Sequence, residues 1–316
     1  MILAEGSRVL VTGGAGFIGH RLVARLLDRG YRVAVVDNLY SGMPMPAAKD
    51  GLSLFQADIR DADALARAFD EAAPDAVVHL AAVHHIPTCE RERALALDVN
   101  IVGAERVLAE CERLGVKLVV LASSGAVYAP VAGVLVEDET ALEAIDNYSL
   151  CKIANESQGR LWVERTGGAV RIARIFNTVG HDDPNGHLIP DILEQLVRET
   201  GAIRLGNTSA RRDYIHADDT ADGLLAVLTQ GAVEAPLEAF NIACGREYPV
   251  TEIIRIIGDL MAREVRCELD ASRLRRVDRP SLVACTAKTK ARTGWSAQSD
   301  LRETIRRTLA GRGVLA

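Results

Sequence analysis

Lysine and long apolar segments are both scarce in this chain of 316 residues. Only five of its 37 basic residues are lysines, and it has no basic run of the kind that binds nucleic acid. No apolar run approaches the ~20 residues that a membrane-spanning helix needs. The formal charge is −6, and the N-terminus leads into a strand-like run without the basic and apolar regions of a signal peptide. We therefore expect a cytoplasmic protein that binds neither nucleic acid nor membrane.

The six cysteines lack the spacing of a metal site or a disulfide framework. None forms a C-x-x-C pair, and none lies at zinc-like spacing from a histidine. Scattered thiols in a chain of this length, without a signal peptide, are typical of reduced intracellular proteins. We expect no metal site.

Short apolar runs alternate with helical patterns along the first half of the chain. Strand-like runs at 8–12, 32–36, 75–80, 117–122 and 169–175 are separated by stretches with helical spacing, which include 17–29, 62–72, 90–114 and 147–166. This alternation predicts an α/β fold, a Rossmann-type doubly wound parallel sheet with helices on both faces.

The pattern is less regular after Asn177. Helical patterns occur at 188–200, 217–230 and 251–262, with a short strand at 240–243. We interpret residues 1–176 as a cofactor domain and residues 177–316 as a smaller, mixed domain that binds the substrate. A strand near 239–243 could return to the main sheet, so the chain could cross between the domains more than once.

Gly13, Gly16 and Gly19 lie between the first strand and the helix after it. In such a unit the first glycine permits a tight turn, the second lets the backbone approach a pyrophosphate, and the third packs helix on strand. Asp37 ends the second strand, where a carboxylate can bind the adenosine ribose and disfavours a 2′-phosphate, so NAD is favoured over NADP. Taken alone, the glycines could form a flexible loop, and Asp37 could merely start a turn with Asn38.

Tyr148 and Lys152 are four residues apart and therefore share one face of a helix. An ammonium group beside a phenol lowers the pKa of the tyrosine, so that it can exchange protons near neutrality. Ser124 comes after the strand at 117–122, at the edge where open α/β sheets bind ligands, and could hold a substrate oxygen against the tyrosine. A Y-x-x-x-K pair by itself is usually a surface pair, but its position after the glycine turn, Asp37 and Ser124 predicts a redox site.

With these motifs the chain resembles the extended short-chain dehydrogenase/reductases, in particular the nucleotide-sugar epimerase/dehydratase group that includes UDP-galactose 4-epimerase. The resemblance covers nearly the whole chain. It extends to Asp58-Ile59, His79 to Ala82, Asn100, Ser123 to Tyr128, Arg174 to Asn177, Arg212 to His216 and Thr293 to Trp295.

The resemblance implies that Tyr148 is the acid/base, that Lys152 assists it and contacts the nicotinamide ribose, and that Ser124 binds substrate. The implied NAD-binding residues are Gly13, Gly16, Phe17, Ile18, Gly19, Asp37, Asn38, Asp58, Ile59, Leu80, Ala81, Ala82, Asn100, Tyr148 and Lys152. The implied substrate-binding residues, for a nucleotide-diphosphate sugar, are Ser124, His84, His85, Asn177, His187, Leu188, Arg212 and Arg275. The family also implies a homodimer, formed through the helices near 94–114 and 147–166.

Several of these residues have plainer interpretations. Asp58 could cap the helix that begins near Asp61, and His84-His85 could be a partly solvated structural pair. His181 could serve as a second acid/base or be an ordinary loop residue.

The reaction is inferred from the two residues after Ser124. By the same resemblance, family dehydratases carry acidic residues there, whereas this chain has Gly125 and Ala126, which hold no proton to give. We therefore expect an NAD-dependent nucleotide-diphospho-sugar 4-epimerase that works through a transient 4-keto-sugar. A UDP-sugar is the favoured substrate, with TDP- and GDP-sugars as alternatives. The other hypotheses are a 4-keto-sugar reductase, another dehydratase of the family, and a non-enzymatic NAD-binding regulator.

Overall fold

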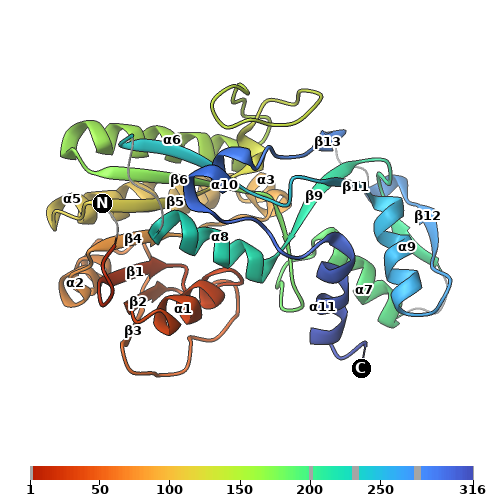
Figure 1. The fold of residues 1–316 in the computed structure, drawn as a ribbon, viewed down its shortest axis with the longest axis horizontal. Coiled ribbons are helices and arrows are strands. Elements are labelled where there is room, and N and C mark those ends of the chain that lie inside the picture. The colour runs from red at the N-terminus through yellow and green to blue at the C-terminus, as the bar shows by residue number, and fades with distance from the viewer. Residues whose placement is uncertain (1–2, 199–201, 230–234, 274–278, 316) are drawn as a thin grey trace.

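The computed structural model describes residues 3–198, 202–229, 235–273 and 279–315. Seven strands of the described chain form one parallel sheet (Figure 1). In spatial order they are β10 (Leu237–Ile242), β6 (Ala169–Ile175), β5 (Leu118–Ser124), β4 (Ala76–His79), β1 (Arg8–Thr12), β2 (Arg32–Asp37) and β3 (Leu52–Gln56). The chain order reverses between β1 and β4, which creates a crevice for ligands at their carboxyl ends. The predicted doubly wound α/β fold is confirmed.

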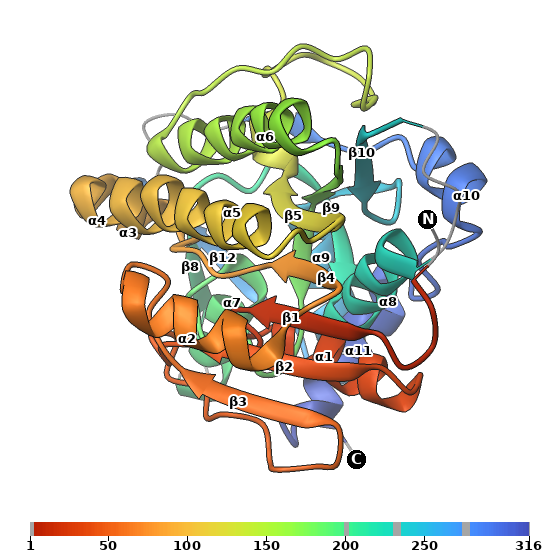
Figure 2. The same ribbon diagram turned by 90° about the vertical axis from the view of Figure 1, so that its left-hand side faces the viewer.

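One face of the sheet is covered by α1 (Gly19–Asp28) and α8 (Ala217–Thr229), which lie side by side in both views (Figures 1 and 2). Their apolar residues recur at helical spacing. Leu22 and Leu26 of α1 join Leu224 and Leu228 of α8 in one buried cluster with the strands. A helix from the second half of the chain therefore covers the main sheet.

The other face is covered by α2 (Ala62–Ala72), α5 (Ala104–Arg113) and α6 (Asn147–Thr166). Phe69, Leu108 and Trp162 are fully buried there, and the Trp162 indole donates to the Leu108 carbonyl at 3.0 Å. Asp146 caps the start of α6, since its carboxylate accepts from the Ser149 amide at 2.7 Å. These contacts set the position of α6, which carries Tyr148 and Lys152.

The helical stretch predicted at 90–114 is divided in the structure. It comprises α3 (Ile86–Arg91), α4 (Arg93–Leu97), a π-helical turn at Asp98–Gly103, and α5. The turn brings Gly103 so close to the sheet layer that a Cβ there would lie 2.6 Å from the Ile59 side chain. Periodicity alone could not reveal this break, because it depends on a contact with a distant segment.

A second layer lies to the right of the sheet in Figure 1. Its strands are β7 (Asn177–Val179), β9 (Arg211–His216), β11 (Glu247–Pro249) and β13 (Ser281–Leu282) in one sheet, and β8 (Ala202–Leu205) and β12 (Arg266–Leu269) in another. Its helices α7 (Leu188–Arg198), α9 (Val250–Leu260) and α11 (Leu301–Gly311) share a core of mainly isoleucine and leucine side chains. α10 (Ala287–Thr293) lies beside β10.

The division of the chain in space differs from its division in sequence. After β9 the chain returns to the main sheet, adds α8 and β10, and then leaves for the second layer again. β10 includes the strand expected near 240–243 and pairs in parallel with β6. Throughout the described segments, every helix is too short or too polar to cross a bilayer.

Candidate active site

The glycine turn after β1 is tightly packed against the loop after β4. Gly13 has a φ of 72°, and a Cβ there would lie 2.7 Å from the Ala81 amide nitrogen. At Gly19 a Cβ would lie 2.1 Å from the Gly13 carbonyl oxygen, so neither position accepts a larger residue without backbone movement. No side chain caps the start of α1, and a helix N-terminus of this kind can bind phosphate.

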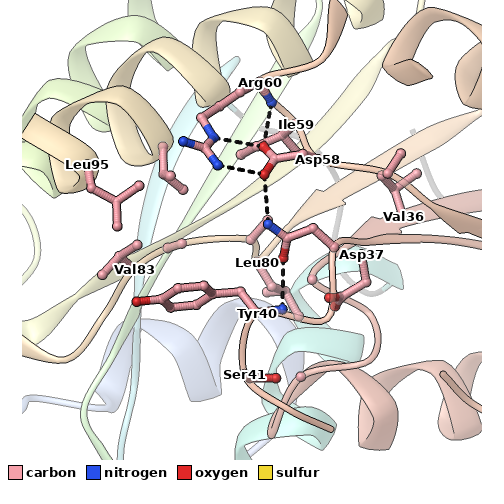
Figure 3. Close-up of a pocket in the computed structure, with 17 residues that line it drawn as sticks. Val36, Asp37, Tyr40, Ser41, Asp58, Ile59, Arg60, Leu80, Val83 and Leu95 are labelled. Carbon is pink, nitrogen blue, oxygen red and sulfur yellow. Dashed lines mark hydrogen bonds and ion pairs between the residues drawn. The ribbon is translucent and has the colours of Figure 1, made fainter. Parts of the chain in front are cut away.

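A cavity runs beside this turn at the carboxyl ends of the strands (Figure 3). Of the predicted NAD-binding residues, its walls contain Gly13, Gly16, Asp37, Asn38, Asp58, Ile59, Leu80, Ala81 and Ala82. Sequence analysis missed the other lining residues, which are Val36, Tyr40, Ser41, Ala57, Arg60, Val83, Leu95 and Val99. This lining suits the adenosine end of a dinucleotide, because small residues leave room beside the turn and the Asp37 carboxylate ends β2.

Asp58 lies between two partners on the cavity wall (Figure 3). Its carboxylate accepts from Arg60 Nη2 at 2.8 Å and from Asn38 Nδ2 at 2.8 Å. The Arg60 guanidinium holds the pKa of Asp58 well below its usual range. Asp61 is the residue that caps α2, since it accepts from the Ala64 amide at 3.0 Å. Asp58 therefore does not cap the helix, and donors of Arg60 and Asn38 occupy both of its carboxylate oxygens.

Asp37 supports the glycine turn as well as lining the cavity. One carboxylate oxygen accepts from the Ala15 amide at 3.0 Å and the other from the Leu39 amide at 2.8 Å. Each oxygen has a second lone pair, so these bonds leave room for ribose hydroxyls. The turn role and the ribose role are compatible at this residue.

Six predicted NAD-binding residues lie outside the cavity wall: Phe17, Ile18, Gly19, Asn100, Tyr148 and Lys152. The Phe17 ring packs on Gly180 and against the Arg21 guanidinium, and Ile18 packs on the core. Asn100 is buried, and both ends of its side-chain amide hydrogen-bond the Val83 backbone at 2.8 Å. The Asn100 side chain therefore shapes the cavity through Val83.

The structure brings Tyr148, Lys152 and Ser124 together at the end of β5. Ser124 lies close enough to the Tyr148 hydroxyl to act on its pKa. The Lys152 ammonium lies 5.9 Å from the centre of the Tyr148 ring and donates to the Ala122 carbonyl at 2.8 Å. Both α6 residues thus face the strand end, as their four-residue spacing predicts.

We expected Lys152 to lower the pKa of Tyr148, and this prediction is wrong. Burial raises the pKa of Tyr148 above its ordinary value, and Ser124 opposes that rise. Burial also lowers the pKa of Lys152 to about 8. Desolvation of the phenol therefore outweighs the neighbouring ammonium, which is bonded to a backbone carbonyl.

A buried ion pair lies one turn beyond Lys152 on α6. Glu156 accepts from Arg174 Nε at 2.9 Å and Nη2 at 2.7 Å, and from the Ser123 hydroxyl at 2.6 Å. Arg174 also donates to the Tyr128 hydroxyl at 3.0 Å, which in turn donates to Asn241 at 2.7 Å. The pair joins α6, β5, β6 and β10, and sequence analysis did not identify it as part of the site.

Three histidines cluster where the two layers meet. The His187 ring centre is 5.9 Å from those of His84 and His85. His187 Nδ1 hydrogen-bonds the fully buried Asp183 carboxylate at 2.6 Å, and Asn185 Nδ2 donates to His84 Nε2 at 3.0 Å. The His84 side chain is exposed to solvent at the edge of this cluster. Sequence analysis missed Asp183 and Asn185.

His181 lies apart from this cluster, with its ring against Gly311 of α11. Among the other predicted substrate residues, Asn177 donates to the Asp213 carbonyl at 2.9 Å, Arg212 donates to the Arg211 carbonyl at 2.8 Å, and Leu188 begins α7. Asn177 and Arg212 lie on the paired strands β7 and β9. Arg275 is outside the described residues.

The parallel sheet, the glycine turn and the Tyr148/Lys152 pair define a nucleotide-binding protein of the Rossmann class. The profile of the NAD dependent epimerase/dehydratase family matches residues 9–243, and the chain belongs to this family. The predicted resemblance is confirmed.

Known relatives extend the match over nearly the whole chain. GDP-6-deoxy-D-mannose reductase of Pseudomonas aeruginosa is 26% identical, with 96% of each chain covered. UDP-glucose 4-epimerase 2 of Arabidopsis thaliana is 30% identical, with 94% of this chain and 93% of the relative covered. The crystal structure of Thermus thermophilus UDP-glucose 4-epimerase in complex with NAD has a TM-score of 0.85 at 26% identity, covering 97% of this chain and 99% of that one. The family is NAD-dependent, which confirms the predicted cofactor.

Replacing Glu156 with Gln is expected to destabilise the protein by about 3–5 kcal/mol, because Arg174 is then buried without its counter-charge. Glu164→Gln on the same helix is the matched control. Its pair with Arg160 is exposed, so we expect a loss of roughly 0.5 kcal/mol or less. Urea unfolding followed by circular dichroism measures both. Equal losses in the two variants would contradict the buried role of Glu156.

The lowered pKa of Lys152 has a consequence for stability. Between about pH 8 and 10.5 the unfolded chain holds the Lys152 proton more tightly than the folded protein does, so this residue makes stability rise with pH across that window. Lys152→Met removes the effect. We expect the free energy of unfolding of Lys152→Met, relative to that of the wild type, to fall by up to ~3 kcal/mol from pH 8 to 10.5 in urea unfolding. The difference between the exposed-site variant Lys117→Met and the wild type should stay nearly constant.

Proposed function

We propose that the protein is an NAD-dependent nucleotide-diphospho-sugar 4-epimerase. The observation that carries this proposal is the meeting of Tyr148, Ser124 and Lys152 at the end of β5, together with a cavity suited to the adenosine end of a dinucleotide. When bound, NAD accepts and returns the hydride that interconverts a sugar alcohol and its ketone. Tyr148 takes the hydroxyl proton and gives it back, Ser124 orients that hydroxyl, and Lys152 places a positive charge beside the phenol ring.

The residues after Ser124 favour epimerisation over dehydration. A Cβ at Gly125 would lie 2.9 Å from the Phe176 ring, so position 125 has no room for an acidic side chain. Ala126 is apolar. Elimination of water needs an acid/base beyond Tyr148, and these positions supply none.

The substrate side of the proposal rests on the second layer. The family resemblance implies that Asn177, Leu188, Arg212 and the histidine cluster would hold the diphosphate and the sugar. Relatives named UDP-glucose 4-epimerase support a UDP-sugar, and the Pseudomonas reductase supports a GDP-sugar as the alternative. That reductase also supports the second candidate activity, reduction of a 4-keto-sugar with NADH.

Exposed apolar side chains on α6 support a homodimer. Leu150 and Leu161 are 45% and 44% exposed, and Val102, just before α5, is 44% exposed. Burial of these side chains against a second copy would remove them from water.

The test is a proton NMR assay on a panel of UDP-, TDP- and GDP-hexoses and hexuronic acids, with NAD and no added reductant. A C4 epimer that forms to equilibrium without net NADH is the expected result, and it also identifies the sugar and the nucleotide. If no member of the panel reacts and NADH is consumed when 4-keto-sugars are supplied, the protein is a reductase.

Tyr148→Phe is expected to lower turnover in this assay by several orders of magnitude, since no other described side chain at the end of β5 is positioned to take the proton. NAD binding, followed by quenching of tryptophan fluorescence, should be retained. Tyr31→Phe, at a half-buried position in the core, is the control and should leave turnover unchanged. A Tyr148→Phe variant that keeps its biological role would support a non-enzymatic regulator.

A further inference from the structure

Arg279 is a buried arginine that contacts the segment after Ser124. It precedes β13, and its side chain is only 7% exposed. The guanidinium donates to the Ala126 carbonyl at 2.8 Å and to the Tyr128 carbonyl. These acceptors lie about 150 residues earlier in the chain, so the contact joins the second half of the protein to the end of β5.

Arg279 carries its charge without a carboxylate partner among the described residues, which do not include 274–278. Within the described segments, no carboxylate lies at ion-pair distance from its guanidinium, and both of the hydrogen bonds it makes go to neutral carbonyls. Burial lowers its pKa, the neighbouring charge of Arg212 lowers it further, and Asp146 and Glu143 act against this from a distance. An unpaired buried cation is costly, and an apolar side chain would avoid that cost, so packing alone does not account for an arginine here.

The two carbonyls belong to the segment that orients Ser124. The Ala126 amide donates to the Ser124 hydroxyl oxygen at 3.2 Å, and Ser124 lies close to the Tyr148 hydroxyl. Tyr128 is fixed at its hydroxyl by Arg174 and Asn241 and at its carbonyl by Arg279. A fork with two donors therefore holds the middle residue of the short turn at Gly125–Val127 and the residue that follows the turn.

We propose that Arg279 is a positioning residue that sets the place of Ser124 beside Tyr148 by holding the carbonyls of Ala126 and Tyr128. This inference rests on the proposed function only in that Ser124 and Tyr148 act in the reaction. Arg279 itself touches neither of these side chains. Loss of the fork should loosen the turn and misplace the Ser124 hydroxyl without removing any group that binds the substrate.

The test compares Arg279→Met with the wild type in two measurements. Amide hydrogen exchange of the full-length protein should be several-fold faster in peptides that cover 123–130, and unchanged in the distant helix α2. In the sugar-nucleotide assay kcat should fall roughly 10- to 100-fold, as displacement of a catalytic group by about 1 Å predicts, while KM changes little. Added guanidinium ion should restore part of kcat.

Arg263→Met is the matched control, because that arginine also donates to a backbone carbonyl, that of Leu196, in the second layer. It should leave exchange at 123–130 and kcat unchanged. Arg279→Lys keeps the charge but lacks the two-donor fork, so we expect its amide exchange rate at 123–130 to lie between the rates of the wild type and of Arg279→Met. If Arg279→Met does not fold, the Arg279→Lys variant decides the question.

Unchanged exchange at 123–130 in both Arg279 variants would overturn the proposal. A raised KM with unchanged kcat would also overturn it and would make Arg279 a ligand-binding residue. If the wild type turns over no sugar nucleotide, the proposed function fails, while the exchange measurement still decides whether Arg279 holds the turn.

Discussion

The ion pair between Glu156 and Arg174 is the interaction on which the arrangement of the site depends. It is nearly inaccessible to solvent, and every polar atom of the Glu156 carboxylate has a donor, from Arg174 or Ser123. Since α6 also carries Tyr148 and Lys152, the pair fixes the position of those side chains along the helix axis relative to the end of β5. A displacement of the helix by one turn would bury both charges without partners, which costs several kcal/mol per ion. Register and catalytic geometry are therefore held by the same contact.

Contacts within one strand–turn–helix unit could be predicted from the sequence. The glycine turn, Asp37 at the end of β2, and the Tyr148/Lys152 spacing depend on local geometry, which sequence spacing reports directly. Glu156 and Arg174 could not be paired in this way, because the topology of the sheet decides which strand lies under α6. The same holds for Arg279 and Ala126. Asp183 was missed for a different reason, since its four-residue spacing from His187 occurs in a loop, where no periodicity suggests a common face.

The second half of the chain was less predictable because its strands are short and pair with distant segments. β9 lies between β11 and β13, and Asp213 within it accepts from the amides of Cys244 and Gly245 at 3.0 and 2.8 Å. Burial raises the pKa of this carboxyl to about 6. A run of two or three residues cannot show alternation, so such strands carry no clear pattern of their own. Their positions depend on side-chain to backbone bonds like those of Asp213.

The return of the chain to the main sheet explains how two layers can form one site. β10 pairs with β6 and presents Asn241, which accepts from the Tyr128 hydroxyl and donates to the carbonyls of Leu135 and Cys285 at 3.1 and 3.0 Å. One side chain thus ties the segment after Ser124 to the C-terminal region of the chain. Because Arg279 contacts the same segment from the second layer, the groups proposed to hold the substrate and the groups proposed to act on it share a single rigid support. Separation of the two layers would cost the bonds from Arg279 to this segment.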